Sequence, residues 1–215
     1  WLDATPDVTV RENHIRGDTS LRSQDRGNGI HLFNTTGALI EGNDISETRD
    51  AIYIETANRN TIRGNVMSDL RYGIHYMYSM HNLLENNVTR GTRTGYALMQ
   101  SKYLKVFNNR SENDENYGIL MNFITNSELR NNVVTGVSQG QSAGVVISGA
   151  EGKAVFIYNS LYNTFEGNYF GHSNIGIHLT AGSEENQVFN NAFVENQRQV
   201  KYVATRTQFW AEDGK

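Results

Sequence analysis

The sequence predicts an all-β protein, a right-handed parallel β-helix of about eight coils of about 22 residues each. Three observations predict it: an Asn recurs at a nearly fixed step, apolar residues hold fixed places around it, and Pro is almost absent. The single Pro in 215 residues agrees with this fold, because proline has no N–H for the hydrogen-bond ladder that joins the coils. We expect one β-helix domain over residues 1–215.

The recurring Asn sets the length of each coil. The series is Asn13, Asn43, Asn65, Asn87, Asn109, Asn132, Asn168 and Asn191, with steps of 30, 22, 22, 22, 23, 36 and 23 residues. Asn tolerates the left-handed conformation of tight corners, and stacked Asn side chains form ladders in parallel arrays. We therefore expect each Asn to lie at a corner and to bond to the Asn of the next coil.

Apolar residues mark three short strands in each coil. One apolar residue recurs three residues before each Asn, another position two residues after it is mostly apolar, and a third strand of the Gly-Ile type begins about 14 residues before it. Helices are not expected, because each patch is short and rich in Gly and Asn. The ladder of a leucine-rich repeat is missing from the sequence.

The two long steps predict insertions near residues 17–28 and 136–153. Both segments are rich in small or polar residues, and each fits a contact loop as well as a tolerated surface insertion. The repeat is already running at Val8–Ile15 and continues to about Tyr202, so we expect the array to be truncated at both ends, with its capping coils outside this chain. No signal peptide is expected within this chain.

Composition excludes several classes of protein. Without Cys there is no disulfide scaffold, Cys-based zinc site or cysteine nucleophile. No apolar run approaches the roughly 18 residues that span a membrane. A net charge of −4 does not indicate nucleic-acid binding.

Alternation along the Gly-Ile strand turns one set of side chains outward. Ile74 holds the inward place, so His75 and Met77 face outward. Met99 holds the place of Met77 in the next coil, about 4.8 Å away. Imidazole and thioether are soft ligands that suit Cu(I). With two residues of the following corner added, the predicted copper ligands are His75, Met77, Met99, Met80 and His81.

A protein-binding surface is an alternative interpretation of the same outer face. Large apolar side chains are expected along it, and such a patch is typical of a protein interface. These side chains are Phe33, Met77, Met99, Leu120, Phe156 and Tyr158.

An enzyme acting on acidic polysaccharide is a further alternative. Such enzymes use paired carboxylates or a carboxylate beside Arg or Lys. The candidate acids are Asp44, Glu47, Asp50, Glu55 and Asp69. Several of these acids lie at a predicted corner, where solvated acids are expected. The acidic run Glu112–Glu115 could also hold calcium, but a solvated turn fits it better. We predict no catalytic residue.

Longer motifs run in order over nearly the whole chain. They are RYGIHYMYS (71–79), GYALM (95–99), YGIL (117–120), VFIYN (155–159), GIHLTAGSE (176–184) and QVKYV (199–203), followed by Thr205-Arg206 and Trp210. Together they resemble the NosD family of periplasmic maturation proteins of nitrous oxide reductase. This pattern is more specific than the generic β-helix repeat.

The resemblance implies a periplasmic accessory protein of denitrification that is not an enzyme. It implies docking onto an ABC transporter (NosF/NosY), with the copper chaperone NosL and nitrous oxide reductase (NosZ) as further partners. Copper, or alternatively sulfur, is the implied cargo. The resemblance assigns no ligands, so the His and Met set rests on spacing. The alternative function is a polysaccharide-binding or polysaccharide-processing β-helix (lyase, hydrolase or epimerase) acting on acidic glycans.

Overall fold

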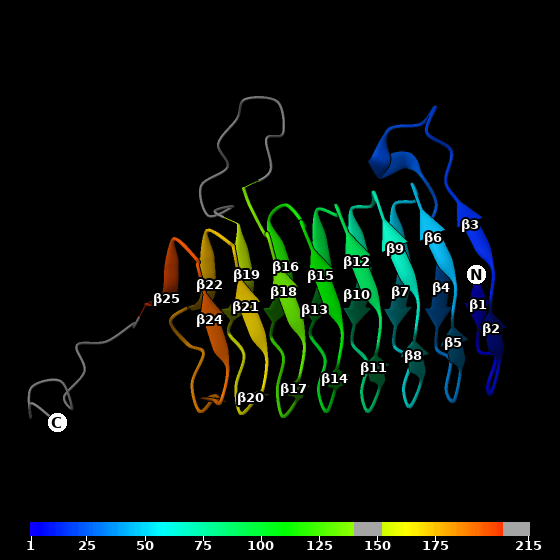
Figure 1. Cartoon of the computed structure of the whole chain (residues 1–215). Helices are drawn as coiled ribbons and strands as arrows, with labels where there is room; N and C mark the ends of the chain where they lie inside the picture. The colour runs from blue at the N-terminus through cyan, green and yellow to red at the C-terminus, as the bar shows by residue number, and fades with distance from the viewer. Residues whose placement is uncertain (140–151, 204–215) are drawn as a thin grey trace, which may run out of the picture.

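A computed structural model describes residues 1–139 and 152–203 (Figure 1). Within these residues three parallel sheets wind around one core, and a full coil contributes one strand to each sheet. Each strand pairs in register with its equivalents in the neighbouring coils, and the strands at the two ends of each sheet pair on one side only. The predicted parallel β-helix is therefore confirmed.

The long sheet holds the Gly-Ile strands. Its order is β1 (Leu2–Asp3), β4 (Ile30–Phe33), β7 (Asp50–Glu55), β10 (Tyr72–Met77), β13 (Thr94–Met99), β16 (Tyr117–Asn122), β19 (Lys153–Tyr158), β22 (Ile175–Leu179) and β25 (Arg198–Tyr202). The second sheet holds β2 (Thr9–Arg11), β5 (Leu39–Glu41), β8 (Thr61–Arg63), β11 (Leu83–Glu85), β14 (Lys105–Phe107), β17 (Glu128–Arg130), β20 (Thr164–Glu166) and β23 (Gln187–Phe189). The third sheet holds β3 (His14–Arg16), β6 (Asp44–Ser46), β9 (Val66–Ser68), β12 (Val88–Arg90), β15 (Arg110–Glu112), β18 (Val133–Thr135), β21 (Tyr169–Gly171) and β24 (Ala192–Val194).

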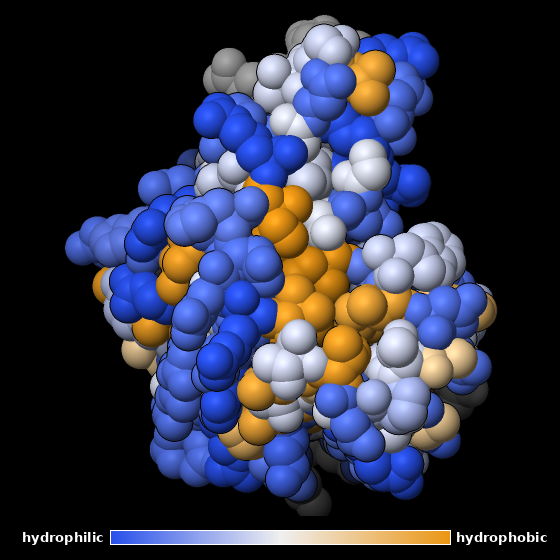
Figure 2. Space-filling model, turned by 90° about the vertical axis from the view of Figure 1, so that its right-hand side faces the viewer, coloured by the Kyte–Doolittle hydropathy of each residue, from blue (hydrophilic) through white to orange (hydrophobic). Residues whose placement is uncertain are grey.

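The core is a column of stacked aliphatic and aromatic side chains. Ile52, Ile74 and Ile119 of the long sheet are buried, as are Ile62 and Leu84 of the second sheet. Burying one such side chain contributes roughly 1.5–3 kcal/mol. Figure 2, which views the molecule from the side where β1, β2 and β3 lie, shows apolar side chains in the centre and hydrophilic ones around them.

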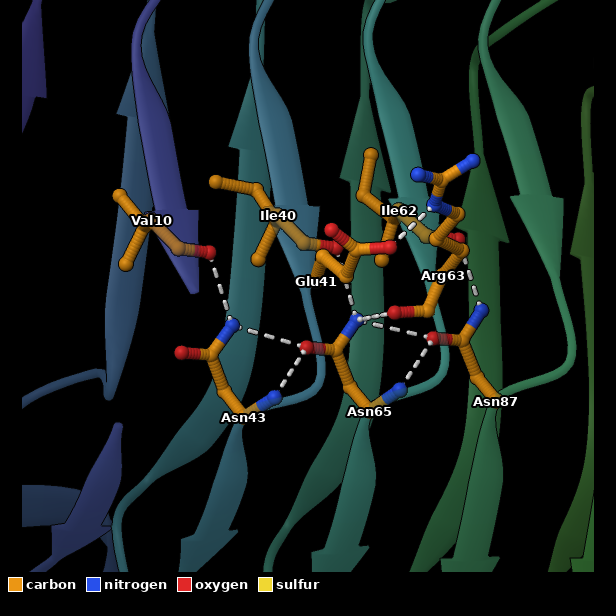
Figure 3. Close-up of polar contacts among 8 residues, drawn as sticks. All are labelled: Val10, Ile40, Glu41, Asn43, Ile62, Arg63, Asn65 and Asn87. Atoms are coloured by element: carbon orange, nitrogen blue, oxygen red, sulfur yellow. Dashed lines mark hydrogen bonds and ion pairs between the residues drawn. The ribbon is translucent and has the colours of Figure 1, made fainter. Parts of the chain in front are cut away.

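The predicted Asn ladder is present and buried (Figure 3). The Asn43 side chain donates from Nδ2 to Asn65 Oδ1 at 2.9 Å and to Val10 O at 3.0 Å. Asn65 repeats the arrangement by donating to Asn87 Oδ1 at 3.0 Å. The backbone N–H of Asn43 also donates to Asn65 Oδ1, at 3.0 Å. Each amide thus satisfies buried backbone groups as well as the next side chain.

The left-handed residue at this corner is not the ladder Asn but the residue before it. Gly42 and Gly64 have φ of 63°, and Asn86 and Asn108 have φ of 55°. We expected one Asn to supply both the turn and the ladder, and the structure divides these roles between two residues. An inward side chain is needed for the ladder, whereas the turn needs only backbone freedom.

The first predicted insertion is confirmed as an excursion between β3 and β4 (Figure 1). It contains a single turn of 3-10 helix, η1 (Ser23–Asp25), and Arg26 Nη1 ties it back by donating to Glu47 O at 3.0 Å. The second predicted insertion, 136–153, lies largely outside the described residues, and its last residue, Lys153, begins β19. In the part of the chain that the structure describes, no helix is long and apolar enough to cross a membrane.

Candidate metal site on the long sheet

The outer face of β10 carries the predicted ligands at the expected places. Ile74 and Tyr76 point inward and are fully buried. His75 lies opposite Tyr53 on one side and Ala97 on the other. The Tyr53 and His75 rings stack, with centroids 4.5 Å apart and planes inclined by 20°. The predicted outward orientation of His75 is confirmed, but the ring packs in a row of neighbours and its side chain is only 12% exposed.

A buried carboxylate holds His75 in place. Asp50, from the start of β7, is 1% exposed, and its Oδ2 lies 3.0 Å from His75 Nδ1. Arg71 binds the same carboxylate through both of its oxygens, from Nε at 2.8 Å and from Nη2 at 2.6 Å. The expectation that Asp50 is a solvated corner acid is therefore wrong. Together with Arg71 and His75 of the next coil, Asp50 forms a buried charged cluster.

The state of Asp50 decides which nitrogen of His75 carries the proton. Burial acts to raise the pKa of Asp50, but hydrogen bonds from His75 and Arg71 outweigh it and hold the pKa below its ordinary value. An ionised carboxylate only accepts hydrogen bonds, so Nδ1 of His75 must be the donor. In the neutral ring, Nε2 then keeps its lone pair, and no described residue forms a hydrogen bond with it.

Two methionines lie side by side next to this histidine. Met77 of β10 pairs in register with Met99 of β13, and both are half-buried. Adjacent strands are about 4.8 Å apart, so both thioethers belong to one patch of the outer face. Glu55 lies opposite Met77 on the other side. We call His75, Met77 and Met99 the face group.

Met80 and His81 lie beyond a turn, on the corner that follows the long sheet. Tyr78 and His81 have positive φ values of 51° and 58°. His81 stacks on Tyr103, with ring centroids 4.8 Å apart and planes inclined by 8°. Met80 forms a parallel bridge with Lys102. The structure thus separates the predicted ligands into the face group and a corner group, Met80 and His81.

The donor set of the face group fits copper better than zinc or calcium. Among residues 1–139 and 152–203, no three His, Asp or Glu side chains are grouped to hold a metal ion. A site built here has to use thioether sulfur together with imidazole, and that set suits a soft ion such as Cu(I). A carboxylate that orients the ligating His is the usual outer partner of such a ligand.

Several acids considered for an enzyme or for a calcium corner are occupied by other contacts. Glu47 pairs with Arg16, and Glu112 pairs with Arg90 and Arg110 at 2.8 Å each. Asp114 is buried, and its oxygens accept hydrogen bonds from the Thr92 backbone N–H at 2.7 Å and from the hydroxyls of Thr92, Ser111 and Thr89. The expectation of a solvated acidic turn is wrong at Asp114. Thr92 holds the same inward place one coil earlier, and this 22-residue step is the signal that sequence reasoning missed.

Comparison of the sequence with known protein families shows which family the chain belongs to. The model of the NosD family, described as periplasmic copper-binding protein, matches residues 11–215. The chain belongs to the NosD family. Two curated relatives, each named as a probable ABC transporter binding protein NosD, are 64% identical over 215 residues in Pseudomonas aeruginosa and 60% identical over 216 residues in Stutzerimonas stutzeri. The match covers all of this NosD chain and 50% of each relative, so the chain spans about half their length.

Solved structures share the fold with this NosD chain. The Dettilon tailspike protein aligns with a TM-score of 0.55 and 16% identity, covering 84% of this chain and 42% of its own. The Streptococcus pneumoniae surface protein and adhesin PfbA aligns with a TM-score of 0.52 and 9% identity, covering 94% and 68%. At these identities the likeness concerns the β-helix alone.

Proposed function

We propose that this NosD chain binds Cu(I) through His75, Met77 and Met99 and serves the maturation of the copper sites of nitrous oxide reductase. One observation carries the assignment. Asp50 fixes the His75 ring through Nδ1 beside two methionines paired on adjacent strands. The description of the family as copper-binding supports it.

The chemistry of the face group suits a cargo ion that has to leave again. Two thioethers and a neutral imidazole carry no charge, and thioether sulfur needs no deprotonation before it binds a metal. The charge of Asp50 is balanced by Arg71, so it orients His75 without strongly attracting divalent ions to the site. Uncharged thioether and imidazole ligands suit Cu(I), the ion that the chain would relay between partners.

The proposed partners follow from the family and the names of its members. The curated relatives are named as ABC transporter binding proteins. We propose that the chain docks the NosF/NosY transporter, takes copper from NosL and serves NosZ in the periplasm. The role is that of a binding protein and not of an enzyme. Two of the candidate enzyme acids, Asp50 and Glu47, form ion pairs with Arg side chains of the same chain, which supports this.

A Cu(I) titration against a competing chelator tests the proposal. The variant His75→Ala with Met77→Leu is expected to lose stoichiometric binding. The matched control, Met80→Leu with His81→Ala, removes the same two ligand types from the corner group and is expected to keep it. Met77→Leu preserves volume, so the fold is retained.

Two outcomes contradict the proposal. One is equal binding by the wild type and by the His75→Ala, Met77→Leu variant. The other is absence of Cu(I) binding together with cleavage or epimerisation of a uronate polymer, which would favour the polysaccharide alternative.

A further inference from the structure

Aromatic side chains occupy strained backbone positions on one edge of the molecule. At the corner that follows the long strands, bulky rings have φ between 51° and 58°. These residues, which we call the aromatic corner, are Tyr78, His81, Tyr103, Phe123 and Tyr162. Bulky residues rarely adopt this conformation, because the Cβ crowds the backbone.

Another corner of the same molecule shows which residues this geometry favours. The left-handed positions before the ladder Asn are Glu12, Gly42, Gly64, Asn86, Asn108, Asn131, Gly167 and Asn190. Apart from Glu12 in the first coil, every one is Gly or Asn, the residues that tolerate the conformation best. The aromatic corner departs from this rule, so its rings are not explained by backbone preference.

Packing does not explain the rings either. Tyr78 is 54% exposed, Tyr103 44%, Phe123 49% and Tyr162 58%. Buried rings stabilise a fold by the area they remove from water, and these rings leave about half of it in solvent. Exposed Tyr and Phe in a row are typical of a binding surface.

A groove lies within the aromatic corner. Tyr78, Gln100 and Phe123 hold equivalent places in three successive coils, directly after β10, β13 and β16. The two rings are therefore about 10 Å apart, with the Gln100 position between them. The groove has a volume of about 320 Å³, and its lining also includes Met80 and Lys102.

The charge of the groove is positive. Lys102 is the charged residue of its lining, and no acid lines it in the part of the chain that the structure describes. The ammonium lies 5.7 Å from the centre of the Tyr103 ring and makes no ion pair with a described residue. A carboxylate of a partner molecule would therefore pair with Lys102 without displacing another acid.

We propose that the aromatic corner is the docking surface for a partner protein that presents an extended acidic segment. A carboxylate of the segment pairs with Lys102, and an apolar side chain enters between Tyr78 and Phe123. The choice of a protein as occupant rests on the proposed function. Met77 and Met99 immediately precede Tyr78 and Gln100 in the chain, so a docked partner lies next to the face group.

Binding of two purified probes to the protein tests this surface: NosL, and the solubilised NosF/NosY transporter. Tyr78→Asn with Phe123→Asn removes both rings but suits the left-handed backbone, so the fold is kept. We expect this variant and Lys102→Glu each to weaken one probe at least tenfold. The wild-type affinity for that probe should also fall as salt is raised. Phe189→Asn, which removes an exposed ring from the second sheet, is the control and should bind as the wild type does.

Unchanged binding of both probes to both variants overturns the docking surface. The docking surface is also overturned if the variants keep binding both proteins but lose binding of oligogalacturonate. That result would assign the groove to a glycan. A Cu(I) titration of the same variants separates the two proposals. If the variants keep copper binding and dock as the wild type does, only this surface is refuted. If the variants dock more weakly but the wild type binds no copper, only the metal site is refuted.

Discussion

Removing one amide from the middle of the Asn ladder should destabilise the whole array. In Asn65→Ala, the Asn43 backbone N–H loses its acceptor at 3.0 Å, and Ile40 O loses one of its donors, at 3.0 Å (Figure 3). Asn43 Nδ2 keeps its bond to Val10 O, and Asn87 Oδ1 keeps the bond from the residue-65 backbone. One buried backbone group, the Asn43 N–H, is thus left without a partner, because Ile40 O still accepts a ladder hydrogen bond from β8.

The expected cost follows from this count. A buried polar group without a partner costs roughly 1–3 kcal/mol, so the free energy of unfolding should fall by about 2 kcal/mol. Urea unfolding followed by circular dichroism measures it, as a lower midpoint at unchanged slope. The control is Asn13→Ala, whose side chain is exposed at the first rung, so water replaces the lost bonds. We expect that variant to lose about 1 kcal/mol or less. Equal losses for the two variants, or no loss at Asn65, would refute the reasoning.

Three further variants test separate contacts. Asp50 has a lowered pKa in the fold, so the ionised group contributes to the free energy of unfolding above its unfolded pKa near 3.9. This contribution is lost as the pH falls towards the folded pKa. In Asp50→Asn, the free energy of unfolding should therefore depend less on pH in this acidic range. The buried Tyr76 hydroxyl has no hydrogen-bond partner among the described residues, so Tyr76→Phe should unfold at an equal or higher urea concentration, and a clear loss would reveal a missed partner. A Cβ on Gly95 would lie 2.6 Å from an Asp114 oxygen, so Gly95→Ala should lower the melting temperature by several degrees, whereas Gly27→Ala meets nothing within 4 Å and should not.

The repeat was predictable because the fold repeats one local solution. Asn65 and its equivalents recur at a fixed step, and the apolar places around them follow the same step. The outward orientation of His75 and Met77 needed only the inward place of Ile74 and strand alternation.

The buried polar cluster was not predictable by the same reasoning. Asp50 faces Tyr72 in register, and Arg71 reaches it from one position to the side. Acids at corners are usually solvated, so the position of Asp50 in the repeat led to the wrong expectation. The division between face group and corner group also needed backbone angles, because the turn at Tyr78 separates residues that are close in sequence.

Because every coil adds the same length, the β-helix sets the distance between binding sites that lie on different coils. Each coil adds about 4.8 Å to the length of the molecule without altering the local geometry of its neighbours. Inserting or deleting one 22-residue unit away from β10 and β13 would leave the Met77–Met99 pair intact. It would change only how far that pair lies from a partner held elsewhere on the array. Reach and affinity can therefore change independently in such a scaffold.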